Sequence, residues 1–422
     1  MTEPKYSQLA NTLIGSEIVK LGNQIRERVN MGETIYNFTI GDFDPSIFPI
    51  PKQLEEKIVF AYRHHQTSYP AAEGEMELRK SVSRFLAHWE NLHYSEAEIQ
   101  IASGGRPLMY SLFQCVVDKG DKVIYAVPSW NNNHYTHLTG GEHCVIEALP
   151  ENNFMPSAKD VEPHIKGATL ICLCSPQNPT GTTLHKKELE KICQMVVAEN
   201  KRRGADEKKL YMMYDQMYWM LTYGKNDHVN PVSLVPAMKD YTVFIDGISK
   251  SFCATGVRVG WSMGPASLIA KMKAILSHLG AWAPMAEQKA TAAFLQQNDH
   301  IKHFLETYKE AIEYRLTHIF SGIKKLKEEG FAVDAIAPQA AIYLTVKVDL
   351  AGKKKANGEL LTNQADVTQY LLEEAKLAIV PFHCFGASHD SAWYRMSVGT
   401  CKKEDIEPMI ASLRGALAKL SK

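Results

Sequence analysis

The sequence lacks the marks of membrane, secreted and nucleic-acid-binding proteins. No apolar run reaches the roughly 18 residues of a membrane-spanning helix, and the polar N-terminus lacks the apolar core of a signal peptide. Neither sign of charge is in excess, because Lys and Arg together number 47, as do Asp and Glu. We therefore expect no nucleic-acid partner and no membrane partner.

The cysteines also lack the spacing of a disulfide framework or a metal site. The 8 cysteines among 422 residues are scattered and form no repeated Cys-x-x-Cys pairs. Cys172 and Cys174 alternate along an apolar run, which is typical of core positions. The histidines, His134 and His137 among them, do not combine with cysteines at metal-ligand spacing. The sequence therefore predicts no metal site and a reduced, cytoplasmic protein.

The middle of the chain alternates apolar runs with amphipathic stretches such as 186–201. The runs are typical of buried strands, and they span residues 123–127, 169–174, 210–214 and 241–245. Near-continuous apolar strands alternating with helices predict a mainly parallel sheet covered on both faces. Ligands of such sheets bind at the carboxyl ends of the strands, where Asn178, Asp215 and Lys250 fall.

After about residue 298 the pattern changes to that of a smaller α+β domain. We expect a long helix over 301–329, short strands at 342–346 and 394–398, and helices near 363–376 and 402–420. The N-terminal part begins with a helical stretch around 16–28 and continues into a loop, 38–45, that Gly and Pro mark.

Lys250 follows the last of the four apolar runs, between small residues. An amine at that place can be desolvated, have its pKa lowered and form a Schiff base with a carbonyl cofactor. Arg258, eight positions later, can hold a phosphate. A single lysine at a strand end is most often a surface residue, so the interpretation depends on the other motifs.

Three further motifs lie at strand ends. Residues 102–107 join a strand to a helix through Gly104 and Gly105, and helix N-terminal amides bind anions. Residues 174–181 form a Pro- and Gly-rich loop that contains Asn178, and Asp215 directly follows a strand. Each motif alone is also compatible with an ordinary turn.

Together these motifs resemble the class I and II aminotransferases, which bind pyridoxal phosphate. Residues 249–261 contain that family's Ser-Lys, spacer and Gly-x-Arg-x-Gly-aromatic string. Residues 178–181 read Asn-Pro-Thr-Gly, and residues 215–218 match Asp-x-x-Tyr. The resemblance covers about residues 35 to 415 and implies an aspartate aminotransferase-like fold (fold type I), with a mainly parallel seven-stranded sheet and a smaller α+β domain.

The resemblance implies roles for the residues around the cofactor. Lys250 would carry pyridoxal phosphate as a Schiff base and act as general base, and Asp215 would keep the pyridine nitrogen protonated. Tyr218 and Asn178 would bond the phenolic oxygen, and Trp130 would stack on the ring. The phosphate set that the resemblance implies comprises Gly104, Gly105, Arg106, Ser249, Arg258 and, from a neighbouring subunit, Tyr69.

The resemblance also implies a substrate site and a homodimer with shared active sites. Arg395 would grip the α-carboxylate, since a fork of donors suits bidentate binding, with Gly41 and Asn178 beside it. Arg106 departs from the small polar or acidic residue common at its position. In a branch similar to the aspartate/prephenate aminotransferases a lysine there binds the distal carboxylate of the substrate. Arg106 either plays this part or only lies beside the phosphate or in solvent.

The implied domains are an N-terminal segment of the small domain (1–47), a large cofactor-binding domain (48–298), and a long connecting helix with the C-terminal small domain (299–422). The implied activity moves an amino group between an L-amino acid and a 2-oxo acid. The resemblance favours an amino acid of the aspartate or glutamate type. Tyr36, Phe38 and Trp219 leave an aromatic substrate open, and a pyridoxal-phosphate-dependent C–S β-lyase shares most of these residues. A cofactor-sensing regulator is less favoured, because 35 residues are too few for a DNA-binding domain.

Overall fold

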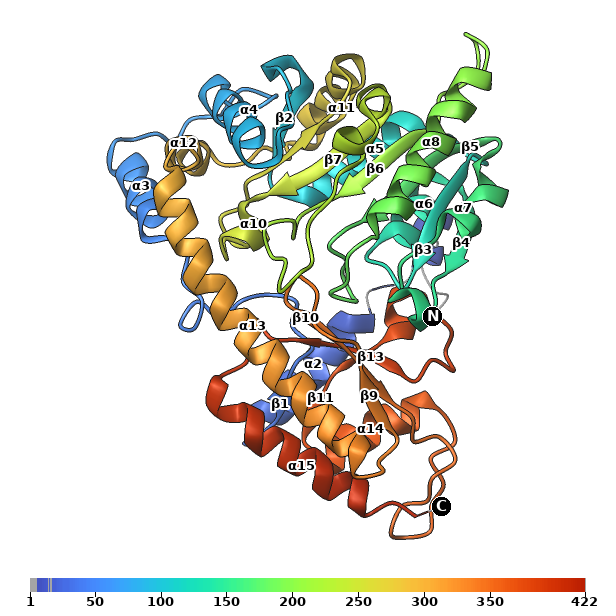
Figure 1. The fold of residues 1–422 in the computed structure, drawn as a ribbon. Coiled ribbons are helices and arrows are strands. Elements are labelled where there is room, and N and C mark those ends of the chain that lie inside the picture. The colour runs from blue at the N-terminus through green and yellow to red at the C-terminus, as the bar shows by residue number, and fades with distance from the viewer. Residues whose placement is uncertain (1–5, 14, 16, 422) are drawn as a thin grey trace.

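The computed structural model of the chain describes residues 6–13, 15 and 17–421, and a seven-stranded sheet forms its larger part (Figure 1). The strand order is β2-β8-β7-β6-β5-β3-β4. Neighbours from β7 to β4 run parallel, and β8 runs antiparallel to both β2 and β7. The predicted α/β fold with a mainly parallel sheet is confirmed. The strands are β2 Ile99–Ala102, β3 Lys122–Val127, β4 Glu142–Glu147, β5 Ala168–Cys174, β6 Tyr211–Asp215, β7 Thr242–Gly247 and β8 Gly260–Met263.

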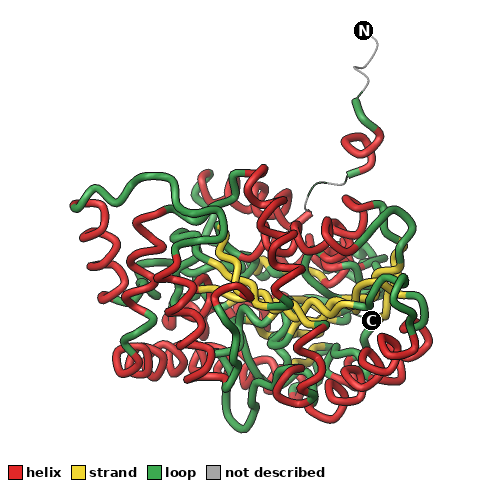
Figure 2. The backbone as a smooth tube through the Cα atoms, turned by 90° about the horizontal axis from the view of Figure 1, so that it is seen from above, coloured by secondary structure: helices red, strands yellow, loops and turns green. Residues whose placement is uncertain are grey.

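Helices cover both sides of this sheet, as Figure 2 shows. Every residue of β7 is buried, as are most of β5 and β6, which explains why these strands read as continuous apolar runs. The helices of this part are α3 Lys52–Arg63, α4 Met76–Glu90, α5 Gly105–Val116, α6 Asn132–Thr139, α7 Ala158–Ile165, α8 Lys186–Arg202, α9 Pro231–Leu234, α10 Ile248–Ser251, α11 Ala266–Leu279 and α12 Met285–Phe294.

A second, smaller sheet lies below the first in Figure 1, with α13 (Asn298–Glu328) running from one part to the other. Its four strands are antiparallel in the order β12-β13-β10-β9. The predicted helix over 402–420 begins later, at Ile406, because Lys403–Asp405 form a separate 3-10 turn. The elements are β9 Val333–Ala335, β10 Tyr343–Val348, β12 Val380–Pro381, β13 Trp393–Ser397, α14 Gln364–Glu374, η4 Phe382–Phe385 and α15 Ile406–Ala418.

The N-terminal segment joins the smaller part through β1 (Tyr36–Asn37), which pairs in parallel with β11 (Leu377–Ala378). Before it come α1 (Gln8–Thr12) and α2 (Glu17–Asn30). Some predicted positions lie outside the described residues. Ser16, the predicted start of the N-terminal helix, is one of them. The others are residues 1–5 and 14 of the predicted segment 1–47, and residue 422 of the predicted segment 299–422. The pairing brings the loop after β1 to the junction between the two sheets.

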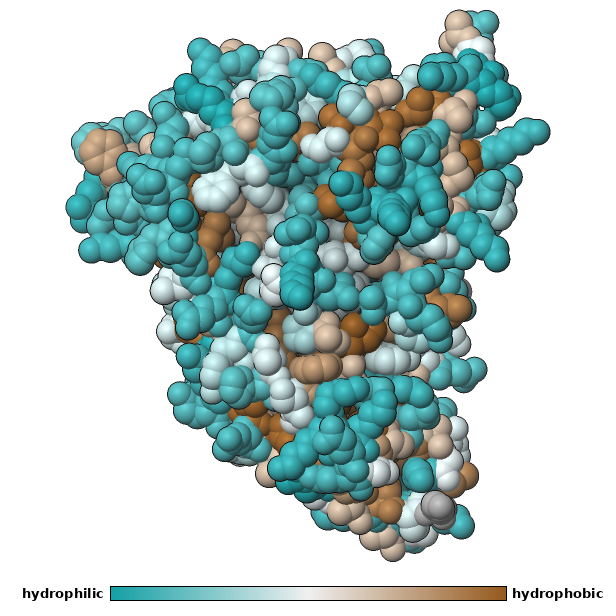
Figure 3. All heavy atoms as spheres, in the orientation of Figure 1, coloured by the Kyte–Doolittle hydropathy of each residue, from teal (hydrophilic) through white to brown (hydrophobic). Residues whose placement is uncertain are grey.

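The face drawn in Figure 3 is mainly hydrophilic, with apolar side chains set among polar ones. Buried residues of α13 recur at intervals of three and four, at Ile301, Leu305, Tyr308, Ile312 and Leu316. Its other face carries charged residues. Within the described residues, each helix is too short or too polar to span a lipid bilayer.

Gly181 lies where the loop after β5 meets the smaller sheet. Its φ is +68°, and a Cβ there would lie 2.1 Å from the backbone oxygen of Tyr343. Its carbonyl accepts a hydrogen bond of 2.9 Å from the Ala340 amide, and the preceding Thr180 carbonyl accepts one of 2.8 Å from Thr345 Oγ1. Glycine at this position therefore allows the two sheets to approach closely.

We predict that Gly181→Ala lowers the free energy of unfolding by about 3 kcal/mol, because both φ and a backbone contact oppose a side chain. Gly120→Ala is the matched control, since Gly120 has φ +87° but no heavy atom within 4 Å of the place that a Cβ would occupy. The free energy of unfolding of this control is expected to fall by about 1 kcal/mol. Denaturant unfolding of both variants measures the difference, and equal losses would contradict this explanation.

Candidate active site

Lys250 lies in the short helix α10, directly after β7, and its amine points to the N-terminal segment. Nζ donates a hydrogen bond of 2.6 Å to the Gly41 carbonyl. Nζ also lies 5.4 Å from the ring centroid of Phe43 and 5.9 Å from that of Tyr218. Burial lowers the pKa of Lys250 to about 8, while the nearby Asp42 carboxylate opposes the shift. Ser249, beside it, is buried.

Asp215 ends β6 and is buried. Its Oδ1 accepts a hydrogen bond of 3.0 Å from the Met217 amide. Burial raises the pKa of Asp215 to about 6, because desolvation disfavours the carboxylate. Tyr218 follows in the next turn, also buried, and its hydroxyl lies 2.6 Å from that of Tyr343.

Arg395 comes from β13 of the smaller sheet and is 2% exposed. Its Nη1 donates to Asn178 Oδ1 at 3.0 Å, and its Nη2 donates to the Thr39 carbonyl at 2.7 Å. Its Nε is buried and, within the described part of the chain, has no hydrogen-bond partner. Burial lowers the pKa of the guanidinium. The peptide bond between Asn178 and Pro179 is cis.

Gly41 connects these groups. A Cβ on Gly41 would lie 3.0 Å from the Tyr343 hydroxyl and 3.4 Å from Arg395 Nη1. Gly41 therefore contacts Lys250 through its carbonyl and leaves space for Arg395 through its missing side chain. The structure thus brings five of the predicted site residues into one chain of contacts: Gly41, Asn178, Tyr218, Lys250 and Arg395.

Gly104 and Gly105 begin α5, where they meet Arg258. A Cβ on Gly104 would lie 2.2 Å from Arg258 Nη2, and one on Gly260 would lie 2.7 Å from the Gly104 carbonyl carbon. The Arg258 guanidinium is exposed and donates to the carbonyls of Thr255 (2.7 Å) and Ser103 (2.8 Å). A helix N-terminus and an exposed guanidinium thus lie together, which is an arrangement that binds anions.

Trp130 and Arg106 lie at the edge of this group. The Arg106 guanidinium carbon is 5.1 Å from the Trp130 ring centroid, and Trp130 packs near Phe385, 6.3 Å between centroids. Tyr69 stands apart, because it is 85% exposed and its ring contacts Trp282, with 5.5 Å between centroids. The structure therefore does not bring Tyr69 to the other predicted residues of the same chain.

The residues present fit pyridoxal phosphate. The junction of Gly104 and Arg258 offers amides and a cation for a phosphate, and a Cβ would fill this space. The buried Asp215 carboxylate, with its raised pKa, would be stabilised by a cationic ring nitrogen. Arg395 suits the substrate rather than the cofactor, because its buried Nε, which has no partner among the described residues, offers a donor to a carboxylate.

Sequence reasoning missed Tyr343, Phe385 and Asp42. The Arg395 guanidinium carbon lies 4.8 Å from the Tyr343 ring centroid and 4.9 Å from that of Phe385. Asp42 accepts a hydrogen bond of 2.6 Å from Thr255 Oγ1 and acts on the pKa of Lys250. Tyr343 and Phe385 come from apolar stretches that resemble core segments, so the sequence carried no local signal for them, whereas Asp42 lay in a loop already marked by Gly and Pro.

Comparison with known proteins agrees with this geometry. An aspartate aminotransferase of Bacillus subtilis (strain 168) is 28% identical over 386 residues, which cover 91% of this chain and 92% of the relative. A probable aspartate/prephenate aminotransferase of Rickettsia felis is 29% identical over 378 residues, which cover 89% and 88%. The crystal structure of the aspartate aminotransferase from Rhizobium meliloti shares the fold, with a TM-score of 0.88 at 24% identity over 99% of this chain and 100% of that one.

The family model described as aminotransferase class I and II matches residues 33–413, which is most of the chain and contains all the residues of the candidate site. The protein therefore belongs to the class I and II aminotransferases and is a pyridoxal-phosphate-dependent transaminase.

Proposed function

We propose that this aminotransferase moves an amino group between an aspartate- or glutamate-type L-amino acid and a 2-oxo acid. The observation that carries the proposal is the contact from Lys250 through Gly41 to Arg395, which sets a low-pKa amine beside a buried guanidinium. One group suits proton transfer at an α-carbon and the other suits an α-carboxylate. The names of the relatives from Bacillus subtilis and Rickettsia felis support the choice of an aspartate-type substrate.

In this proposal, residues of the chain would hold the cofactor by its phosphate and by its ring. Arg258 and the amides of Gly104 and Gly105 would bind the phosphate, with Arg106 and Ser249 nearby, and Asp215 would pair with the ring nitrogen. The hydroxyl of Tyr218, the amide of Asn178 and the indole of Trp130 would make the other contacts to the ring. When bound, pyridoxal phosphate supplies an electron-withdrawing ring that accepts the electron pair left at the substrate α-carbon.

The side chains have separate roles toward the substrate. Arg395 binds the α-carboxylate with its guanidinium fork, and the Asn178 amide, 3.0 Å from Nη1, fixes the orientation of that fork. Lys250 Nζ, neutral above its pKa of about 8, removes the proton from the α-carbon. Tyr343 is a positioning residue, because its hydroxyl holds the Tyr218 hydroxyl and its ring supports Arg395.

Arg106 is our candidate for the distal carboxylate of the substrate. It is exposed and lies against Trp130, whose neighbour Phe385 in turn contacts Arg395. A cation at this place favours a dicarboxylic substrate over an aromatic one. Trp219 does not favour an aromatic substrate, because its indole is buried and donates to Asp246 at 3.0 Å.

We further propose a homodimer with shared active sites, in a reducing cytoplasmic setting. Exposed aromatic side chains at Phe60, Tyr62 and Tyr69 support an interface between copies, in which Tyr69 would reach the phosphate of the second copy. The eight cysteines are free thiols, which supports a reducing compartment. The division at 47/48 and 298/299 remains our proposal for the domains, and the pairing of β1 with β11 supports it.

The proposed reaction is tested by a panel of amino donors mixed with 2-oxoglutarate. We expect aspartate to be consumed with stoichiometric glutamate formation and without ammonia release. Lys250→Ala should abolish turnover, because it removes the amine that transfers the proton in this proposal, while Lys187→Ala, at an exposed position of α8, should retain it. Ammonia release without an acceptor would favour the β-lyase instead, and turnover by Lys250→Ala would refute the assignment of this lysine.

The proposed role of Arg106 predicts a selective loss. Arg106→Ala should raise KM for aspartate and glutamate by about 10-fold or more, because a charge-assisted hydrogen bond is removed, and should change KM for an aromatic donor much less. Steady-state kinetics on both donor classes measure the ratio. An equal rise for both classes would place Arg106 at the phosphate rather than at the substrate.

The pKa of Lys250 predicts the pH dependence of cofactor uptake. Burial stabilises the neutral amine, so the fraction of reactive amine increases as pH rises through about 8. Protein stripped of cofactor should therefore take up pyridoxal phosphate at a rate with a midpoint near pH 8, followed by absorbance. A rate that keeps rising up to the ordinary lysine value of 10.5 would contradict the shift.

A further inference from the structure

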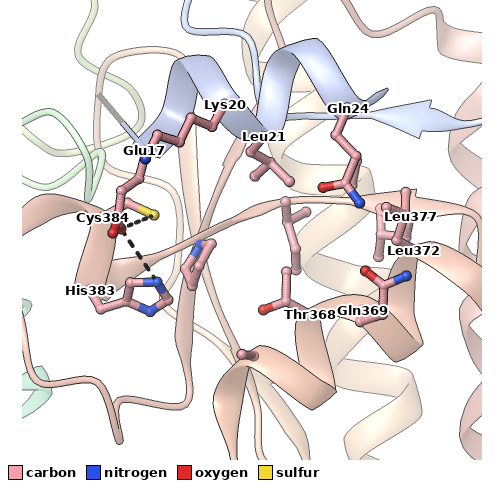
Figure 4. Close-up of a pocket in the computed structure, with 14 residues that line it drawn as sticks. Glu17, Lys20, Leu21, Gln24, Thr368, Gln369, Leu372, Leu377, His383 and Cys384 are labelled. Carbon is pink, nitrogen blue, oxygen red and sulfur yellow. Dashed lines mark hydrogen bonds and ion pairs between the residues drawn. The ribbon is translucent and has the colours of Figure 1, made fainter. Parts of the chain in front are cut away.

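Figure 4 shows a cluster of three side chains where α2 lies against η4. Glu17, from the first turn of α2, points toward His383 and Cys384 of η4. From this cluster we propose a binding site for a divalent cation of the Zn²⁺ type, held by Glu17, His383 and Cys384. Among the described residues, these three have their potential ligand atoms within 4.8 Å of one another.

The distances between the ligand atoms suit a single ion. Glu17 Oε2 lies 3.6 Å from Cys384 Sγ and 3.7 Å from His383 Nε2. With metal–ligand bonds of about 2.0–2.3 Å, neighbouring ligands of a tetrahedral zinc ion are roughly 3.3–3.8 Å apart. The carboxylate oxygen is thus at the spacing of a shared ion from both partners. The ligand atoms of His383 and Cys384 lie within 4.8 Å of each other and would close to this spacing when an ion binds.

The chemistry of the donors also selects the class of ion. Imidazole and thiolate bind Zn²⁺ and Co²⁺ well, whereas Mg²⁺ and Ca²⁺ prefer sets made only of oxygen. Three protein ligands leave a fourth tetrahedral position. On binding, the thiol proton of Cys384 leaves to solvent as the sulfur–metal bond forms, and the oxidation state of the metal does not change.

The surroundings leave room for a water molecule as fourth ligand. A cavity of about 340 Å³ reaches Glu17, His383 and Cys384, far more than the roughly 30 Å³ that one water occupies. The His389 ring stacks on that of His383, with 4.8 Å between centroids, and keeps the imidazole in place. Lys20 lines the same cavity and its charge opposes a cation, so Lys20→Gln should tighten binding.

A bound cation would fasten α2 to η4. The next residue of η4, Phe385, lies against the Arg395 guanidinium, 4.9 Å from its carbon, and its carbonyl accepts a hydrogen bond of 3.0 Å from the Ser129 amide. The ion would therefore join the N-terminal segment to the wall of the substrate site. This predicts a structural role rather than a catalytic one, because none of the three ligands contacts Lys250 or Arg395 through a hydrogen bond in the described part of the chain.

The test is titration of the chelator-treated holoenzyme with Co²⁺, followed by the red ligand-field absorption that tetrahedral cobalt gives outside the cofactor bands. We expect one Co²⁺ per chain. Cys384→Ser and His383→Gln should each weaken binding by about 100-fold or more, because a ligand is lost. Cys144→Ser is the matched control, since Cys144 is also a partly buried free thiol, and it should bind as the unaltered protein does.

A second measurement uses Zn²⁺ and thermal unfolding of the same proteins. Zn²⁺ should raise the unfolding midpoint of the unaltered protein and of Cys144→Ser, and leave that of Cys384→Ser unchanged. Binding that is equal in Cys384→Ser, or a spectrum without tetrahedral bands, would overturn the site. Neither result bears on the transaminase assignment, because the activity assay is independent of both.

Discussion

The hydrogen bond from the Lys250 amine to the Gly41 carbonyl joins the parts of the protein on which the site depends. It connects the end of β7 in the large sheet to the loop after β1, and that loop borders Arg395 from the smaller sheet. Gly41 makes the contact possible, because its carbonyl accepts a hydrogen bond from the amine while its missing side chain leaves space for Tyr343 and Arg395. A larger residue at 41 would separate the amine from the guanidinium.

Three buried ionisable groups give this junction its chemistry. The pKa of Lys250 is lowered to about 8 and that of Asp215 is raised to about 6, both mainly by burial, and Arg395 is 2% exposed. Removing such groups from water costs several kcal/mol each unless an opposite charge arrives. A cationic ring nitrogen against Asp215 and a carboxylate against Arg395 would offset that cost, so binding of cofactor and substrate is favoured by the charges that folding leaves buried.

Much of this architecture could be predicted from the sequence, because it rests on local patterns. Buried parallel strands appear in the sequence as apolar runs. Asn178 and Lys250 follow such strands and Asp215 ends one, all at the same edge of the sheet. The antiparallel direction of β8 could not be predicted. Gly260 and Trp261 of this strand were recognised only as part of the motif around Lys250, and their pairing with β2 and β7 depends on how distant segments fold together.

The residues that the sequence did not reveal depend on contacts between distant segments. Tyr343 looked like a core strand residue, and only its place opposite Tyr218 gives its hydroxyl a role. Glu17, His383 and Cys384 have no metal-ligand spacing along the chain, and they meet because α2 packs beside η4. Sequence spacing detects sites within one segment, so the expectation of no metal site could not take this cluster into account.

Lys250, of all the lysines, is the amine that we expect to hold the cofactor. Borohydride reduction of the holoenzyme, followed by proteolysis and mass spectrometry, fixes the cofactor to the lysine that carries it and identifies that residue. We predict one pyridoxyl group per chain, on Lys250. Labelling of a different lysine, or no labelling of protein that contains the cofactor, would contradict the account.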